Sequence, residues 1–303
     1  MRVHLNTCHA SAETLKLLDP KLTKAQMVLV QNCQICLQAK MTNRSYNSVP
    51  TEFVASHPAQ KLCVDLSFWP TPSVNGCKVL LVIADQFSKF VYSVPLKTKS
   101  AAGEAIEQFV LWVQNFCQKQ VSLVHSDQGG EFMNGRLCEF YRQKGIQATF
   151  SAAYTPQQNG TVERANRTIN EGVRALLLGG DMEDRFWAEA ARALLYAKNL
   201  LPKIQLQGKC PYKLFTGHVK PSLPEFSFGQ DIVYWQPRVK REKLDPPGQR
   251  GQYLGSAMSQ IAHSVPGAHR IWCLATDDVV IVPHVKPYGV CAMLLPVTVG
   301  GTG

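Results

Sequence analysis

Three carboxylates stand in settings that suit the binding of divalent metal ions. Asp65 ends an apolar run, so it should belong to a buried strand, where an acid is costly unless it is paired or bound to a metal. Asp127 opens a glycine-containing turn whose backbone can approach a ligand closely, and Glu163 begins an expected helix. Two Mg²⁺ ions held by such acids can clamp the attacking and leaving oxygens of a phosphodiester displacement. Three unrelated surface acids are the alternative.

The charge of the chain indicates a polyanionic partner. Its 303 residues carry a formal net charge of +10, which favours nucleic acid or an anionic membrane surface. A basic protein with no such partner is the alternative. The N-terminus lacks the apolar segment of a signal peptide, and no apolar stretch reaches the roughly 18 residues of a membrane span. Together with the acids, the charge favours metal-dependent chemistry on nucleic acid and no membrane partner.

A second metal site is predicted near the N-terminus. Two imidazoles, His4 and His9, and the two thiols of a CxxC motif, Cys33 and Cys36, are a ligand set for tetrahedral structural Zn²⁺. The ten cysteines of an apparently intracellular chain also favour thiols or metal ligands over disulfides. Scattered His and Cys are the alternative, and Cys8 is a competing ligand.

Strand and helix signals alternate over the middle of the chain. Strands are predicted at residues 61–68, 79–84 and 90–94, the last closed by Pro95, and then at 121–124 and 147–150. Apolar residues with helical spacing predict a helix over 101–118, and further helices are expected over 131–144, from about 157 or 160 to 178, and over 186–200.

This order predicts an α/β fold with a mixed sheet and flanking helices. Asp65 would lie on the first strand, Asp127 beyond the fourth strand, and Glu163 on a helix that crosses nearby. The expected domains are a small helical zinc-binding module over residues 1–40, a polar linker over 41–56 and the α/β core over 57–202. A basic linker and a small β-rich module follow over 203–303, with strands at 232–235, 251–254, 270–275 and 279–283.

Long motifs around the acids resemble a known family. SDQGGEF at residues 126–132, YTPQQNGTVER at 154–164 and NRT at 166–168 closely resemble retroviral-type integrases, and more narrowly those of Ty1/copia-type LTR retrotransposons. The resemblance implies an RNase H-like core in which Asp65 bridges two Mg²⁺ (or Mn²⁺) ions, Asp127 completing one site and Glu163 the other. Gln128 and His125 depart from the common pattern, but neither departure removes a metal ligand.

The resemblance extends to the N-terminal segment and to the activity. Such elements carry a zinc-binding segment that ends as residues 33–40 do here, although they often have glycine where this chain has Cys8. The implied function is metal-dependent insertion of retrotransposon DNA, in which a 3′-hydroxyl attacks a target phosphodiester. The implied partners are double-stranded element ends and target DNA, and other copies of the chain in a multimer. The implied location is the nucleus, with cytoplasmic virus-like particles, and the chain would be a piece of a Pol polyprotein.

Several basic and polar residues are candidates for DNA contact. Arg167 lies one helical turn after Glu163 and therefore shares its helix face, where arginine positions phosphate well. A solvated helix face, or an ion pair with Glu171, is the alternative, and turn chemistry alone explains the Asn-Gly pair in the preceding loop. The predicted DNA-binding residues are Gln157, Asn159, Arg164, Arg167, Lys240, Arg241 and Lys243.

Two other functions stay open at this point. An RNase H-like nuclease would cut DNA without joining it, and a degenerate, non-catalytic copy would only bind DNA. The integrase-like block at residues 160–167 argues against the first alternative, and the three intact acids argue against the second. The sequence therefore favours a polynucleotidyl transferase.

Overall fold

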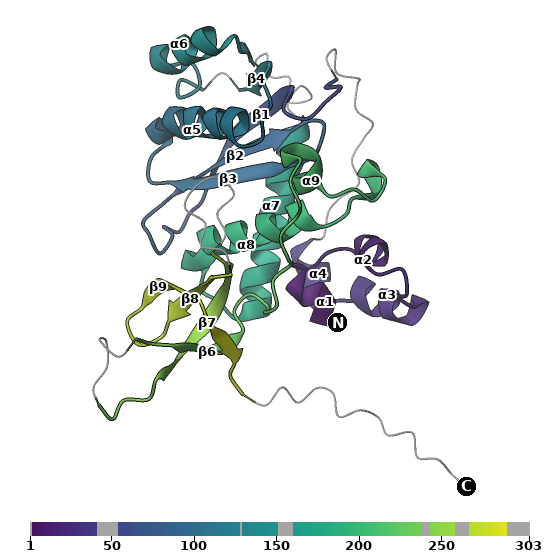
Figure 1. Cartoon of the computed structure of the whole chain (residues 1–303), viewed down its shortest axis with the longest axis vertical. Coiled ribbons are helices and arrows are strands. Elements are labelled where there is room, and N and C mark those ends of the chain that lie inside the picture. The colour runs from purple at the N-terminus through teal and green to yellow at the C-terminus, as the bar shows by residue number, and fades with distance from the viewer. Residues whose placement is uncertain are drawn as a thin grey trace.

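The protein folds around two β-sheets and a group of N-terminal helices (Figure 1). The computed structural model describes residues 2–40, 54–127, 129–150, 160–237, 243–257 and 267–289. Within these ranges no helix combines the length and the apolar character that a membrane crossing requires.

The central sheet contains β1 (Lys61–Phe68), β2 (Val79–Asp85), β3 (Val91–Leu96), β4 (Leu123–Ser126) and β5 (Gln147–Phe150) in the order β3-β2-β1-β4-β5. β1 pairs antiparallel with β2 and parallel with β4, and β4 and β5 are parallel. Every residue of β2 is buried, as expected for a strand covered on both faces. The sheet is mixed, as predicted, and its strand order is that of an RNase H-like fold.

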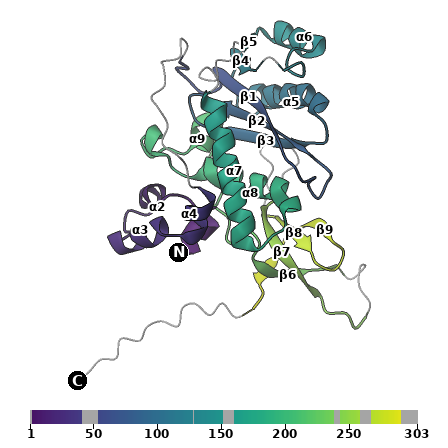
Figure 2. The same cartoon turned by 180° about the vertical axis from the view of Figure 1, so that it is seen from behind.

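Helices cover both faces of this sheet. The turn η1 (Lys99–Ala101) leads into α5 (Ala102–Asn115), which with α6 (Gly135–Lys144) packs on one face. On the other face lie α7 (Gly160–Gly180) and, after the turn η3 (Asp184–Phe186), α8 (Trp187–Leu200). Figure 2 shows α7 in front of the strands. Alternate β1 side chains enter the two cores, since Leu62 and Val64 face α5 while Cys63 faces α7 and α8.

Three predicted boundaries were wrong. The third strand includes Pro95, which lies opposite Leu80, and does not stop before it. β3 is an edge strand, where a residue without an N–H group is tolerated. The helix expected from residue 131 begins at Gly135, because the Asn134 side chain caps it by accepting the Leu137 N–H at 2.9 Å. The fourth strand, expected at 121–124, runs instead from Leu123 to Ser126, in register with β1.

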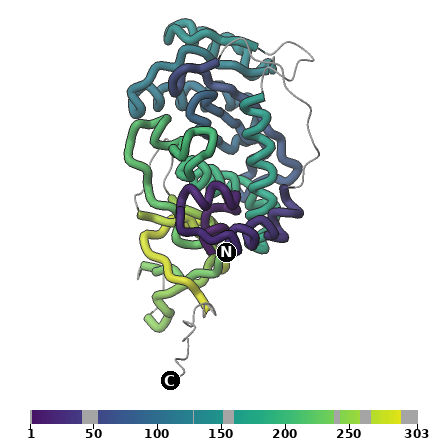
Figure 3. Tube along the Cα trace, turned by 90° about the vertical axis from the view of Figure 1, so that its right-hand side faces the viewer, coloured from purple at the N-terminus to yellow at the C-terminus, as the bar shows by residue number. Residues whose placement is uncertain are grey.

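The N-terminal helices are α1 (Arg2–Asn6), α2 (Ala12–Leu18), α3 (Lys24–Gln31) and α4 (Gln34–Ala39). Ser11 caps α2, and Thr23 with Gln26 forms a capping box on α3. Their small core includes Leu15, Val30 and, from the segment after α8, Leu201. α4 packs on α7, so these helices lie against the α7 face of the central sheet (Figure 3).

The second sheet is antiparallel, with the order β10-β6-β7-β8-β9. Its strands are β6 (Asp231–Trp235), β7 (Gly248–Ser256), β8 (His269–Cys273), β9 (Asp278–Val282) and β10 (Val285–Pro287). The predictions missed β10, the helix α9 (Pro211–Thr216) and the turn η4 (Ile204–Leu206), because each is too short to show periodicity.

The second sheet is fixed to the central one through α8. Arg270 of β8 donates two hydrogen bonds, of 2.7 and 2.8 Å, to the buried carboxylate of Glu189. The ring of Trp272 packs on Phe186, and Gly255 of β7 passes close to Ala193. A buried, bidentate pair of this kind is costly to open, because either partner alone would be an uncompensated charge.

α7 and α8 approach each other closely at Gly172 of α7 and Leu194 of α8. A Cβ atom added at Gly172 would lie 2.5 Å from the Cδ2 atom of Leu194, which is fully buried. Alanine gains about 1 kcal/mol over glycine in helix propensity, but overpacking a core costs about 1–3 kcal/mol. We expect Gly172→Ala to lower the free energy of unfolding by about 1 kcal/mol in urea denaturation.

Gly135→Ala is the matched control, because a Cβ atom at this α6 position meets nothing within 4 Å. It should leave the free energy of unfolding unchanged or raise it by a few tenths of a kcal/mol. Adding Leu194→Ala to Gly172→Ala should cost less than the sum of the two single changes. Strict additivity would contradict the packing argument.

Candidate catalytic and metal centres

Asp65 lies in the middle of β1, between β2 and β4. One of its carboxylate oxygens accepts the Leu66 N–H at 2.8 Å, and the other accepts the side-chain amide of Asn166 from α7 at 2.7 Å. These two hydrogen bonds hold the carboxylate against α7. The predicted burial of this acid is confirmed in part, since the residue is half-buried.

The charge of Asp65 is unfavourable in the protein alone. Burial raises the pKa of Asp65 from its ordinary value of 3.8 to about 6, although the hydrogen bonds from Leu66 and Asn166 oppose this rise. The negative charges of Asp127 and Glu163 raise this pKa further. Asp127 and Glu163 therefore lie near enough to Asp65 to repel its charge, and a cation among the three acids would relieve that repulsion.

Asp127 and Glu163 reach this region from different elements. Asp127 directly follows β4, is exposed, and accepts the Gly129 N–H at 3.0 Å. A Cβ atom at Gly129 would lie 2.9 Å from the Glu131 carboxyl group and 3.0 Å from Asp127 Oδ1, so a larger residue there would displace these carboxylates. Glu163 is exposed in the first turn of α7.

An open pocket joins Asp65 to the side of α7. It is lined by Asp65, Glu163, Asn166, Arg167, Asn170, Glu171 and Arg174. Asn166 received no role in the sequence predictions, although helical spacing from Glu163 could have identified it as facing Asp65. Arg174 was a weaker candidate for DNA contact than Arg167. Arg174 donates to the Ala39 carbonyl at 3.1 Å, which ties α4 to this face of α7.

The structure separates the two arginines predicted to contact DNA. Arg167 lines the pocket with Asp65, whereas Arg164 lines a different cavity on another side of α7. The alternative ion pair between Arg167 and Glu171 is absent from the part of the chain that the structure describes. Lys243 is exposed after β6. Gln157, Asn159, Lys240 and Arg241 lie outside the described residues.

The four predicted zinc ligands come together. The ligand atoms of His4, His9, Cys33 and Cys36 all lie within 4.8 Å of one another. Cys36 Sγ lies 3.4 Å from both His4 Nε2 and His9 Nδ1, and Cys33 Sγ lies 3.6 Å from His9 Nδ1. Among the described residues, this is the one group of three or more potential ligands close enough to hold a single ion. The three acids near α7 are spaced more widely.

The environment of this group suits neutral imidazole. Burial lowers the pKa of His4, and it lowers the pKa of His9 to about 3. His4 Nδ1 lies 2.8 Å from the Ala10 carbonyl oxygen, which leaves Nε2 facing the sulfur. The donor set and its spacing fit tetrahedral Zn²⁺.

Cys8 does not join the group. Its thiol lies 3.6 Å from the Ala193 carbonyl oxygen and packs in the core under α8. Cys8 and His9 both have left-handed backbone conformations, with φ values of 53° and 57°. Glycine adopts such a conformation most readily, so the backbone at Cys8 and His9 is held there by the surrounding packing.

Comparison with known proteins supports the resemblance to integrases. Residues 55–156 match the family model of the integrase core domain. The chain is 28% identical over 236 residues to the retrovirus-related Pol polyprotein from transposon RE1 of Arabidopsis thaliana, which covers 77% of this chain and 16% of that protein. It is 27% identical over 250 residues to the Pol polyprotein from transposon TNT 1-94 of Nicotiana tabacum, covering 80% and 18%.

A viral relative extends the comparison. The chain is 31% identical over 163 residues to the Pro-Pol polyprotein of simian foamy virus type 3, which covers 53% of this chain and 14% of that protein. The chain thus spans less than a fifth of the length of these curated relatives. The matches confirm the resemblance predicted from the motifs: the chain is similar to the Pol polyproteins of plant retrotransposons and foamy viruses, and its residues 55–156 match the integrase core domain.

Proposed function

We propose that this chain is an integrase that joins retrotransposon DNA to target DNA in a metal-dependent strand transfer. The observation that carries the proposal is the half-buried Asp65 of an integrase core, whose pKa is raised by burial and by the nearby charges of Asp127 and Glu163. The proposed organisation is a zinc-binding module over residues 1–40, a linker, a catalytic core over 57–202 and a basic, β-rich module over 203–303.

The three acids would hold two Mg²⁺ or Mn²⁺ ions, with Asp65 shared between them. When bound, such ions favour an ionised nucleophile and neutralise the charge that develops on the leaving oxygen. Asn166 would orient Asp65 through its amide, and Arg167, which lines the same pocket, would contact a phosphate beside the acids. No side-chain nucleophile is required, because a DNA 3′-hydroxyl attacks the target phosphodiester directly.

Partners and location follow from this chemistry as proposals. The net charge of +10 suits double-stranded DNA, both the element end and the target. One active site cannot act on both element ends at once, so a homo-multimer is expected. The integrase would act in the nucleus and could be carried there from cytoplasmic virus-like particles.

Strand transfer in vitro tests the proposal. Purified protein, Mg²⁺ and a duplex carrying the host element's LTR end are mixed with plasmid target, and joined product is measured on gels. Glu163→Gln removes a carboxylate but keeps its size, and joining should fall by more than about a hundredfold. Mutating a group that only orients a metal ligand lowers metal affinity or activity by about 10–100-fold, so the loss of a ligand itself should cost more.

Glu104→Gln on α5 is the matched control, since it makes the same change on an exposed residue of the opposite face. It should leave joining intact. Cleavage without joining would support the nuclease alternative. DNA binding without any metal-dependent chemistry would support the non-catalytic alternative.

The raised pKa of Asp65 predicts a pH dependence of stability. Because the pKa rises from 3.8 to about 6 on folding, the native state binds more protons within this interval and loses stability as pH rises through it. Asp65→Asn removes this penalty. The variant should be more stable than the wild type above about pH 6, by on the order of 1 kcal/mol after allowance for solvent screening, and equally stable below about pH 4.

Urea denaturation at pH 4 and pH 8, without metal, measures this difference. Mg²⁺ should stabilise the wild type and narrow the gap at pH 8, because the ion binds only the native arrangement of acids. If the variant and the wild type differ in free energy of unfolding by the same amount at both pH values, the charge of Asp65 is not the cause of the difference.

We infer that His4, His9, Cys33 and Cys36 hold a structural Zn²⁺ ion. Cys36→Ser should abolish the zinc content measured by atomic emission and lower Tm by more than about 5 °C, since metal binding contributes folding free energy. Cys138→Ser, an exposed cysteine on α6, is the control and should keep both. Full zinc retention by Cys36→Ser would disprove the ligand assignment.

A further inference from the structure

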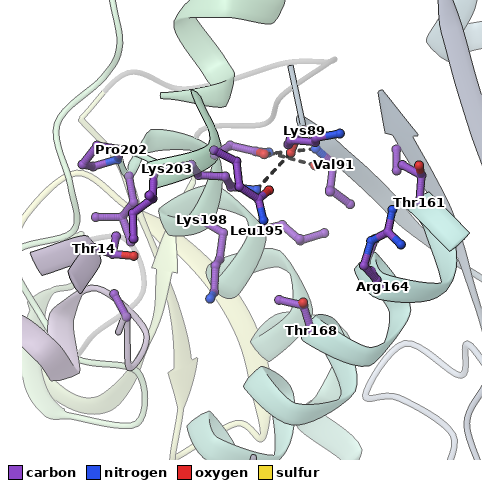
Figure 4. A pocket seen from close by; sticks show the side chains of 17 residues that line it. Thr14, Lys89, Val91, Thr161, Arg164, Thr168, Leu195, Lys198, Pro202 and Lys203 are labelled. Atoms are coloured by element: carbon purple, nitrogen blue, oxygen red, sulfur yellow. Dashed lines mark hydrogen bonds between the residues drawn. The ribbon is translucent and has the colours of Figure 1, made fainter. Parts of the chain in front are cut away.

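A second cavity, of about 470 Å³, lies on a different side of α7 from the acids (Figure 4). Four parts of the chain form its walls: the start of the N-terminal helices at Ala10 and Thr14, the strand edges at Ala84–Val91, one side of α7, and the end of α8 with residues 201–205. α7 faces this cavity through Thr161, Arg164, Ala165 and Thr168, whereas Glu163, Asn166 and Arg167 line the pocket that contains Asp65.

The charges around this cavity all have one sign. Four cations line it, Lys89, Arg164, Lys198 and Lys203, and its lining contains no Asp or Glu. The nearest acids that act on these cations, Asp85 and Glu171, lie outside the lining. Among the described residues, neither Lys198 nor Arg164 has a hydrogen bond or an ion pair.

The other two cations donate only to backbone carbonyls. Lys89 donates to the Gln86 carbonyl at 2.6 Å, and Lys203 donates to the Lys89 carbonyl at 3.2 Å. Burial, followed by repulsion from neighbouring cations, lowers the pKa of both Lys198 and Lys203 to about 8. Cations gathered in a lining that contains no acid repel one another, so an anion in the cavity would be stabilising.

The rest of the lining is mainly apolar, with Val91, Leu195, Leu201 and Ile204 between the charged groups and the hydroxyls of Thr161 and Thr168. A concave, largely apolar cavity with a few converging polar groups is the usual form of a small-molecule site. A duplex presents its phosphates along an extended surface, whereas this cavity is walled by four separate segments. The shape therefore favours a small ligand over a DNA strand.

We propose that this cavity binds a small polyphosphate, of the class of nucleoside triphosphates and inorganic tripolyphosphate, through Arg164, Lys198 and Lys203. Ammonium and guanidinium groups are the usual partners of phosphate oxygens. The cavity includes Thr14 of α2 as well as residues of α7 and α8, so a bound polyphosphate would link the N-terminal helices to the core. This site is independent of the proposed strand transfer, which uses the other side of α7.

Isothermal titration of the full chain with sodium tripolyphosphate, in buffer without divalent metal, tests the proposal. We expect saturable binding that weakens with salt, and binding at least tenfold weaker in the double variant Lys198→Gln/Lys203→Gln. Hydrogen bonds to charged groups contribute about 1.5–3 kcal/mol each, and 1.4 kcal/mol corresponds to tenfold. Adenosine triphosphate in the same titration asks whether the apolar wall adds affinity.

Lys209→Gln/Lys213→Gln removes two exposed lysines outside the cavity and is the matched control, expected to bind as the wild type does. Lys198→Arg/Lys203→Arg keeps the charge and should retain binding. Circular dichroism and zinc content confirm that each variant is folded. Equal tripolyphosphate affinity in the wild type and the Gln variant would overturn the proposal, as would a Gln variant that loses affinity only for an LTR-end duplex.

Discussion

The structure depends on the single helix α7 and on how closely its neighbours approach it. Its first turn carries Glu163, its middle packs against Leu194 where Gly172 leaves no side chain, and its end meets two further parts of the chain. A Cβ atom at Gly179 would lie 3.2 Å from His9 Nε2, and one at Gly180 would lie 2.8 Å from the Phe228 carbonyl oxygen. The acids, the zinc ligands and the second sheet are thus positioned against one rigid element.

The helical repeat also divides the side chains of α7 between two pockets. Residues one turn apart share a side, so Glu163 and Arg167 lie with Asp65, while Arg164 and Thr168 lie with Lys198. The acids gather where a cation would be stabilising, and the lysines gather where an anion would be stabilising. Two sites of opposite preference can therefore exist within one small domain without neutralising each other.

Much of this arrangement was predictable because it rests on local patterns. The strand signals predicted both ends of β1 and of β5 correctly. The residue types and spacing of the histidines and the CxxC motif predicted the group that includes His4 and Cys36. What periodicity could not predict depends on tertiary context. Pro95 is accepted only because β3 is at an edge, and the pairing of Asn166 with Asp65 requires α7 to cross β1. The clustering of Lys89 with Lys203 likewise appears only after folding, since neither lies in a recognisable motif.

The buried pair of Glu189 and Arg270 has a consequence for assembly. Separating the two sheets would break this bidentate pair and the packing of Trp272 on Phe186, so the contacts on α8 oppose a hinge motion between the sheets. Any surface that spans both sheets is then pre-organised, and a ligand that binds across it loses little conformational entropy. The same contacts also set a constraint for the proposed integrase: a change in the angle between the sheets would have to break the Glu189–Arg270 pair, so copies that hold two DNA molecules would adapt mainly through how they pair.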